Sequence, residues 1–501
     1  MTRPISRRDS LKAMGGMALS GLVSGRAVAQ PSPPRRAPNV LFFMTDDQRQ
    51  DALSAYGNAI LKTPHMDRIA AGGVRFAEAF VTNALCAPSR ASILTGLYSH
   101  AHGVISNGDG PTFRNQPGLR DEQLTFPELL RQAGYHTSLA GKWHVPSWPT
   151  GFDQWVILPG QGAYHDPELI ANGVRLKMRG HVEDVIGDQA VTFLRQRPKD
   201  RPFALLCQFK APHRNWSPAA RFEKVFADVT LPLPRTFEDR LEGRPEAVRK
   251  AEMAIADMPD FRDQVPASLP REERKRRNLE LLVKNYYRVL LGVDENVGRV
   301  LDALDKEGVA QDTVVVYTSD NGFFLGEHGL FDKRLMYEPS IRVPMLLRYP
   351  ARVKAGQVDT SHLVLNVDVA PTLLELAGVP VPASMHGRSW VPLLDGGPAP
   401  WRDAFLYEYY EYPAVHCVRK NRGVRTARWK LIHFWEQPEE WELYDLAADP
   451  DETANLAGRP EHAGRVAELR TRLEQLRREV GDFDPPGPPP VAEACTSGIG
   501  Q

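Results

Sequence analysis

Four short runs of consecutive apolar residues constrain the fold of this 501-residue chain more than any other feature. A run that is apolar at every position is typical of a strand buried on both faces, as in a parallel sheet covered by helices. The segments between the runs have the periodicity of helices. This alternation predicts an α/β fold in which a large, mostly parallel or mixed sheet is sandwiched by helices. The runs are NVLFFM (39–44), FALLCQF (203–209), TVVVYT (313–318) and VPMLLRY (343–349), and the helical segments lie around 64–72, 124–134, 182–197 and 279–307.

Residues 1–29 have a different character from the rest of the chain. Arg7 and Arg8 precede a weakly apolar, glycine-rich run, and Ala27-Val28-Ala29 follows it. This is the pattern of a cleavable bacterial twin-arginine signal peptide, and it predicts a periplasmic or secreted protein. A lipid-facing anchor and a basic tail are the alternatives. No later stretch reaches the ~18 apolar residues of a membrane span, so we expect no stable membrane insertion after cleavage.

The composition changes again after the signal peptide and predicts four further segments. Within the main domain (39–395), residues 235–278 are charged and punctuated by proline. We expect them to form an insertion over the rim of that domain. The segment near the C-terminus is rich in aromatic strands, which predicts an α+β subdomain with an antiparallel sheet. The four segments are a proline-rich linker (30–38), a main domain (39–395), the smaller subdomain (396–480) and a flexible tail (481–501).

The chain has only four cysteines. They form no C-x-x-C pair, which argues against a zinc knuckle. Cys207 lies in an expected buried strand, where a thiol is ordinary packing. Cys86 stands directly before Ala-Pro-Ser-Arg and a helix-forming run. If Cys86 is reserved for chemistry, then Cys207, Cys417 and Cys495 can form at most one disulfide.

Carboxylates follow two of the expected strands. Asp46 and Asp47 end the first strand, and Asp320 and Asn321 end another. Ligands gather at the carboxyl ends of strands in open α/β sheets, and adjacent aspartates repel each other unless a cation lies between them. An all-oxygen set suits Ca²⁺ or Mg²⁺ and not Zn²⁺. The alternative is a helix cap at Asp46 and a plain turn at 320–322.

Two longer motifs make the chain recognisable. CAPSRASILTG (86–96) matches C-x-P-S-R-x-x-x-L-T-G, and GYHTSLAGKWH (134–144) matches G-Y-x-T-x-x-x-G-K-x-H. These are signatures of type I sulfatases, which belong to the alkaline phosphatase superfamily. Shorter motifs occur in the family's order, and the resemblance covers nearly the whole mature chain. They are TDDQ (45–48), PH (212–213), SDNG (319–322) and DK (332–333).

The resemblance implies an alkaline-phosphatase-like fold and a sulfatase that hydrolyses a sulfate monoester. In this family a separate maturation enzyme oxidises the motif cysteine, here Cys86, to the aldehyde Cα-formylglycine. The hydrated aldehyde has two hydroxyl groups on one carbon. One attacks sulfur, and the other later expels sulfate as the carbonyl reforms, which divides one barrier into two.

The resemblance also implies the metal site and the role of the motif arginine. Arg90, one helical turn after residue 86, would orient the hydrated aldehyde. The bound ion is expected to be Ca²⁺, with Mg²⁺ as the alternative. Its ligands would be Asp46, Asp47, Asp320, Asn321 and an oxygen of the modified Cys86.

Four more residues carry over by position in the motifs. Lys142 would bind a sulfate oxygen, and His144 would take the proton from the second hydroxyl. The two side chains point to the same side if GKWH is extended. His213 and Lys333 would flank the leaving oxygen. His213 is the better general acid because its reference pKa of ~6.5 allows proton donation near neutrality.

The C-terminal third resembles bacterial glycan sulfatases related to N-acetylglucosamine-6-sulfatase. His416, Arg419, Arg422 and Arg425 interleave with aromatic residues such as Trp435, a combination that suits a sugar. The other interpretation is that these aromatic residues form the core of the small sheet. The expected partner is a sulfated saccharide or a small sulfate ester.

Two other functions remain open from the residues alone. Hydrolases of phosphodiesters and phosphonate monoesters share the superfamily's sheet and metal site. A non-catalytic protein that binds sulfated glycans is the second alternative, and it applies if Cys86 stays unmodified. Basic and acidic residues are equal in number, 62 of each, so we expect no nucleic-acid partner.

Overall fold

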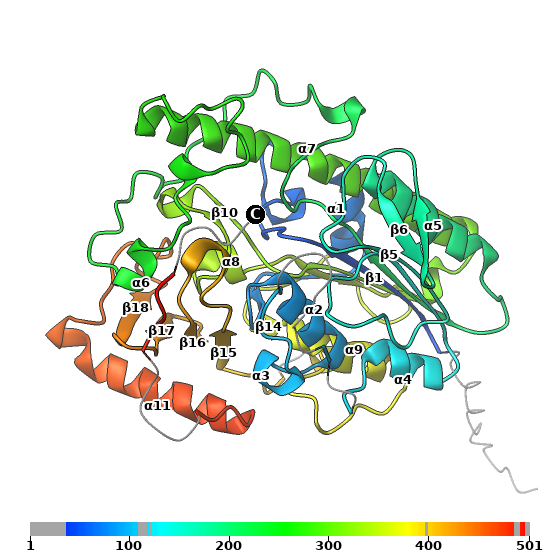
Figure 1. The fold of residues 1–501 in the computed structure, drawn as a ribbon. Coiled ribbons are helices and arrows are strands. Elements are labelled where there is room, and N and C mark those ends of the chain that lie inside the picture. Colours follow the sequence, from blue (N-terminus) through cyan, green and yellow to red (C-terminus); the bar gives the residue numbers. More distant parts are fainter. Residues whose placement is uncertain (1–36, 109–117, 120–121, 396–398, 485–490, 496–501) are drawn as a thin grey trace, which may run out of the picture. The chain divides into compact units, whose positions relative to one another are not determined.

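A mixed sheet of ten strands forms the centre of the described structure, with β1 (Asn39–Thr45) in its middle (Figure 1). β1 pairs in parallel with β8 (Phe203–Gln208) and β9 (Thr313–Ser319), and β4 (His136–Lys142) and β5 (Gln154–Leu158) continue the parallel part. The sheet confirms the predicted α/β class. The strand order is β13 (Gln357–Asp359), β2 (Val74–Phe76), β12 (Met345–Arg348), β9, β1, β8, β4, β5, β6 (Glu168–Ala171) and β7 (Val174–Lys177).

The structure is a computed structural model. It describes residues 37–108, 118–119, 122–395, 399–484 and 491–495. The predicted signal peptide (1–29) and residues 30–36 of the predicted linker lie outside the described residues. Among the residues that are described, no helix combines the length and the apolar character needed to cross a bilayer.

Alternate side chains of β1 enter two separate cores, which explains the continuous apolar run. Leu41 and Phe43 pack in one core, whereas Val40, Phe42 and Met44 pack in the other. Helices cover both faces of the sheet (Figure 1). The first core receives α1 (Pro64–Ala71), α5 (Val182–Gln196) and α7 (Arg271–Lys306), and the second receives α4 (Phe126–Gln132), α9 (Val369–Leu376) and α10 (Val391–Leu394).

The main domain adds one detail to the sequence-based prediction of a mostly parallel or mixed sheet and differs from the prediction in another. The predicted strand at 343–349 forms β12, which runs antiparallel to β9. The predicted helix at 279–307 begins earlier, at Arg271, directly after Pro270. The first two turns of this helix, REERKRR, are polar on all sides, so they lack the apolar periodicity that reveals a helix in sequence. The helix therefore takes the end of the segment 235–278 that was expected to be an insertion.

The C-terminal residues form the predicted antiparallel sheet. Its four strands follow each other in sequence, and α11 (Ala463–Glu479) packs against them (Figure 1). The sheet shares its core with the main domain, because the rings of Phe80 and Phe405 stack with centroids 5.1 Å apart. The strands are β15 (Ala404–Tyr409), β16 (Asn421–Thr426), β17 (Trp429–Phe434) and β18 (Glu440–Asp445).

Short elements complete the described structure. They are α2 (Cys86–Thr95), α3 (Ser99–His102), α6 (Glu246–Arg249), α8 (Glu338–Ile341), β3 (Ala79–Phe80), β10 (Phe324–Leu325), β11 (Phe331–Asp332) and β14 (Val364–Leu365).

One disulfide forms, between Cys417 and Cys495, and it agrees with the predicted limit of one. Cys86 and Cys207 are free and buried. The disulfide attaches part of the segment that we predicted to be a flexible tail, and the Tyr412 hydroxyl also donates to the carbonyl of Glu493 at 2.7 Å.

Candidate active site

The carboxyl ends of β1 and β9 bring the predicted metal ligands together. The two strands are parallel and place Thr45 opposite Ser319, so Asp46 and Asp320 follow side by side. The backbone N–H of Asp47 donates to Asp320 Oδ1 at 3.1 Å. One carboxylate oxygen from each of Asp46, Asp47 and Asp320 lies within 4.8 Å of the others, and all three side chains are buried.

This acidic cluster fits a divalent cation. Among the described residues, the buried oxygens Asp47 Oδ2 and Asn321 Oδ1 have no hydrogen-bond partner. Burial, together with the neighbouring Asp46 carboxylate, raises the pKa of Asp47 to about 6 and that of Asp320 to about 7. Unpartnered buried oxygens and mutually repelling carboxylates are both stabilised by a positive ion. The all-oxygen donor set is the one that Ca²⁺ and Mg²⁺ prefer.

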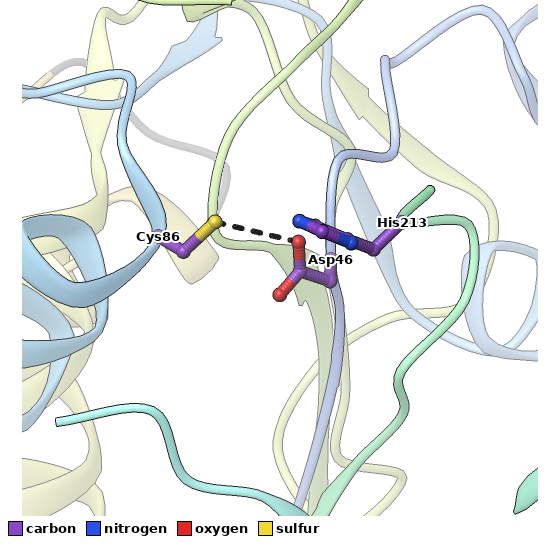
Figure 2. Close-up of side chains that lie close together, drawn as sticks. All are labelled: Asp46, Cys86 and His213. Carbon is purple, nitrogen blue, oxygen red and sulfur yellow. Dashed lines mark hydrogen bonds between the residues drawn. The ribbon is translucent and has the colours of Figure 1, made fainter. Parts of the chain in front are cut away.

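Helix α2 positions Cys86 and Arg90 against this cluster. Cys86 is the first residue of the helix, and its Sγ lies 3.5 Å from Asp46 Oδ1, as Figure 2 shows. Arg90 follows one turn later. Its Nε donates to Asp320 Oδ2 at 2.8 Å and its Nη2 to Asp46 Oδ2 at 2.9 Å. The predicted one-turn spacing therefore brings both side chains to the same carboxylates.

The Cys86 thiol itself is a poor nucleophile in this environment. Its side chain is fully buried. Burial and the nearby Asp46 carboxylate raise the pKa of the thiol far above its usual range. Since the thiolate is the reactive form of cysteine, an unmodified Cys86 would remain a neutral thiol.

Lys142 and His144 both lie at the site, but the backbone that carries them does not have the predicted extended conformation. Lys142 ends β4, and its Nζ lies 2.5 Å from Asp46 Oδ2. GKWH is not extended, because His144 adopts a left-handed conformation with φ of 52°. The two side chains still converge, since Gln161 Oε1 accepts from Lys142 Nζ and Gln161 Nε2 lies 3.2 Å from His144 Nε2.

Steric crowding explains why the GKWH motif begins with glycine. Gly141 has φ of 112°, and a Cβ there would lie 1.8 Å from the carbonyl oxygen of Gln208 on β8. Only glycine permits this approach of β4 to β8. The side chain of Gln208 accepts from Arg90 at 3.2 Å, so the close contact lies directly beside the site.

His213 and Lys333 complete the group of predicted residues. Lys333 Nζ contacts Asp47 Oδ1 and lies 3.3 Å from Cys86 Sγ, and it is 2% exposed, so it is not a solvated surface charge. His213 lies beside Asp46 in Figure 2, and its Nε2 is 4.0 Å from Asp47 Oδ2. The structure thus brings every predicted site residue to one place.

Burial favours the neutral form of both imidazoles. Burial, followed by the positive charge of Lys142, lowers the pKa of His144 and of His213 well below the usual value. A neutral His144 suits the acceptance of a proton. In the free protein, burial disfavours the protonated form of His213 that a general acid requires, although the reference pKa of imidazole lies near neutrality.

The structure brings to the site three polar residues that the sequence analysis gave no catalytic or metal-binding role. Arg214 and Asp332 adjoin His213 and Lys333 in sequence, and their side chains lie 3.6 Å apart. His416 comes from the C-terminal subdomain, and its Nε2 lies 3.2 Å from Asp332 Oδ2. Arg214 had only its adjacency to His213 as a signal, whereas Asp332 belongs to the DK motif (332–333) but was given no role. His416 was noticed only as part of an aromatic and basic pattern.

The three arginines of that pattern have structural partners. Arg419 pairs with Glu440, Arg422 with Asp484 and Arg425 with Glu78, at 2.6 to 2.9 Å. All three are buried. Their role is therefore to stabilise the subdomain and its contact with the main domain, whereas His416 alone of the four lies at the site.

Comparisons of this sequence with known proteins are consistent with the arrangement of the site residues. A family model described as Sulfatase matches residues 38–379, and one described as N-sulphoglucosamine sulphohydrolase, C-terminal, matches residues 326–479. An N-acetylglucosamine-6-O-sulfatase of Bacteroides thetaiotaomicron is 41% identical over 499 residues, which span 90% of this chain and 88% of the relative. Human N-acetylglucosamine-6-sulfatase is 31% identical, spanning 90% of this chain and 87% of the human protein.

Comparisons of structure point the same way. The structure of BT4656 in complex with its substrate D-glucosamine-2-N,6-O-disulfate superposes with a TM-score of 0.83 at 40% identity, covering 90% of this chain and 99% of that one. A phosphonate monoester hydrolase of Agrobacterium radiobacter has a TM-score of 0.69 at 23% identity, covers 88% of this chain and 96% of its own, and shares the fold. The chain belongs to the sulfatase family and is an enzyme that hydrolyses sulfate esters.

Proposed function

We propose that this sulfatase removes the 6-O-sulfate group from a glucosamine-type sugar, N-acetylated or N-sulfated, using formylglycine derived from Cys86 and a bound Ca²⁺ or Mg²⁺. The observation that carries the proposal is the buried Cys86, which contacts both Lys333 and Asp46 of a cluster that includes unpartnered oxygens. The sugar is proposed from the relatives, which are named for N-acetylglucosamine-6-sulfate or bind glucosamine disulfate.

Burial and Asp46 raise the pKa of the Cys86 thiol far above its usual range, so the proposal assigns the attack on sulfur to the hydrated aldehyde and not to the thiol. When formed and hydrated, the aldehyde supplies two hydroxyl groups on one carbon, one to attack sulfur and one to expel sulfate later. Cys86 is fully buried, so the maturation enzyme must act before the chain folds.

Positive charge surrounds the place where the sulfate group would lie. Arg90 holds two of the carboxylates in position, and Lys142 and Lys333 each direct an ammonium group toward the same cluster. Fixed charges of this kind stabilise the negative charge that develops during transfer. When bound, a divalent cation adds positive charge beside the sulfate oxygens and lowers the pKa of the attacking hydroxyl.

The two histidines divide the proton transfers. His144 is neutral and accepts a proton when sulfate is expelled. His213 faces the cluster with Nε2 while its Nδ1 donates to the carbonyl of Arg214 at 2.6 Å. The anionic sulfate ester brings negative charge next to His213, which raises its pKa and favours the protonated form that can donate to the leaving oxygen.

Arg214, Asp332 and His416 supply the sugar contacts in this proposal. They adjoin His213 and Lys333, which flank the leaving oxygen, and they combine hydrogen-bond donors with a carboxylate acceptor. A sugar ring with several hydroxyl groups matches such a mixed set better than a plain aryl ring does.

A panel of defined esters tests this proposal. We expect kcat/KM for N-acetylglucosamine-6-sulfate and for glucosamine-2-N,6-O-disulfate to exceed that for the 3-sulfate and for the galactose-configured 6-sulfate by about 10²-fold or more. His416→Ala should lower the value for the sugars and leave an aryl sulfate within about threefold. Equal rates on both sugar epimers, or a faster reaction with an aryl phosphonate, would contradict the assignment.

The proposal includes export by the twin-arginine route, which carries folded proteins. Replacing Arg7-Arg8 with Lys-Lys should leave active enzyme with formylglycine at position 86 in the cytoplasm of the expressing bacterium. Fractionation followed by an activity assay and peptide mass spectrometry of residues 75–100 measures this. Normal export of the Lys-Lys variant would show that another route is used.

A further inference from the structure

We propose that Lys210 is a positioning residue for sulfate-ester hydrolysis. Its buried side-chain nitrogen donates hydrogen bonds both to the loop that carries Gln161 and to the loop that carries His213. It thereby fixes the positions of Lys142, His144 and His213 relative to one another. The inference rests on the sulfatase activity and on the roles proposed above for Lys142, His144 and His213.

Lys210 lies two residues beyond β8 and is only 2% exposed. Its Nζ donates to the carbonyl oxygens of Gln161 at 3.1 Å and Arg214 at 3.3 Å, and it lies 4.7 Å from the ring centroid of Tyr164. Within the described part of the chain, no carboxylate oxygen lies within 4.0 Å of this ammonium group. Burial, followed by the nearby Lys142, lowers the pKa of Lys210 to about 7, and the amine can donate to both carbonyl oxygens in either protonation state.

The loop that carries Gln161 positions Lys142 and His144. Lys210 holds the backbone of Gln161, and the side chain of Gln161 contacts both catalytic groups. The amide oxygen accepts from Lys142 Nζ, and the amide nitrogen donates to His144 Nε2. One amide therefore sets the separation of the group that binds sulfate and the group that accepts the proton.

The second loop acts on His213. The carbonyl oxygen of Arg214 accepts from Lys210 Nζ and also from His213 Nδ1 at 2.6 Å, so Lys210 fixes the acceptor that orients the imidazole. The N–H of His213 donates to the carbonyl of Lys210 at 3.1 Å, and the hydroxyl of Tyr164 donates to the carbonyl of His213 at 2.6 Å. The loop with Tyr164 and the loop with His213 are thus joined at several points around one ammonium group.

Loss of this link should lower the rate more than the binding of substrate. Displacement of a catalytic group by about 1 Å can cost about 10²-fold in rate. We expect Lys210→Met to lower kcat by about 30-fold to 100-fold while KM changes by less than about threefold, because the sugar contacts lie elsewhere. The assay uses the mature enzyme with an aryl sulfate and with the preferred sugar sulfate.

Lys284→Met is the matched control. Lys284 is also a buried lysine on α7 whose Nζ donates to a backbone carbonyl, that of Ala227 at 2.9 Å. It also pairs with Glu280 at 2.7 Å, and neither partner is a predicted site residue. Both variants should lose thermal stability, and only Lys210→Met should lose kcat. A kcat for Lys210→Met within about threefold of that for Lys284→Met would overturn the proposal.

Two milder variants decide the question if Lys210→Met does not fold. Tyr164→Phe removes one hydroxyl, and Gln161→Leu removes the amide between Lys142 and His144. We expect each to lower kcat by about 5-fold to 30-fold at nearly unchanged melting temperature, as the loss of one or two positioning hydrogen bonds implies. Unchanged kcat in both would refute the proposal. Full activity of Lys142→Ala and His213→Ala would instead refute the roles proposed above.

Discussion

Replacing Cys86 with alanine is expected to lower kcat/KM by about 10⁵-fold, because in the proposed mechanism this residue, as formylglycine, supplies the attacking group. Arg90, Lys142 and Lys333 would still surround the sulfate group, so binding of the sulfate ester should persist. Turnover of an aryl sulfate and calorimetric titration with a sulfated sugar measure the two effects separately. The wild-type enzyme should contain formylglycine at position 86 by peptide mass spectrometry.

Cys207→Ala is the matched control for this variant. Both cysteines are free and fully buried, so each replacement removes one buried thiol and should cost about 1–2 kcal/mol of stability. Only Cys86→Ala should lose activity. A fully active enzyme that retains an intact thiol at position 86 would show that the chemistry is different.

Removal of the divalent cation is expected to lower kcat by about 10³-fold, which corresponds to the several kcal/mol of charge stabilisation that a metal supplies. Chelation should also lower the melting temperature, since an ion that binds only the folded state stabilises it by mass action. Addition of Ca²⁺ or Mg²⁺ in separate samples should restore both, and the ion effective at the lower concentration identifies the preferred metal.

Asp47→Asn should remove most of the cation's effect, because Asp47 Oδ2 is one of the unpartnered oxygens. Asp294→Asn is the control. Asp294 is a buried carboxylate on α7 that accepts from the backbone N–H groups of His65 and Met66 at the start of α1, and it is not a member of the acidic cluster. Asp294→Asn should lower the melting temperature. It should leave unchanged the increase in kcat and in melting temperature that follows the addition of cation. If chelation changes neither rate nor melting temperature, the acidic cluster binds no essential metal.

The sequence alone determined the features that depend on local pattern. Side chains of a strand alternate between two faces, so burial of both faces forces a continuous apolar run, and NVLFFM predicted β1 correctly. The spacing of Cys86 and Arg90 is one helical turn, so their convergence followed from the helix alone. The carboxylates after β1 and β9 met because parallel neighbours end at one edge.

Contacts between distant segments decided the rest. The direction of β12 depends on how the chain crosses the sheet, and the left-handed His144 depends on how it leaves β4. Gln161 and Lys210 carry no local signal, because their positions matter only through the loops they join. Burial also set the pKa of His213, which residue type had placed near neutrality. Tertiary structure alone determines which groups surround a side chain, and those groups determine its protonation and its role.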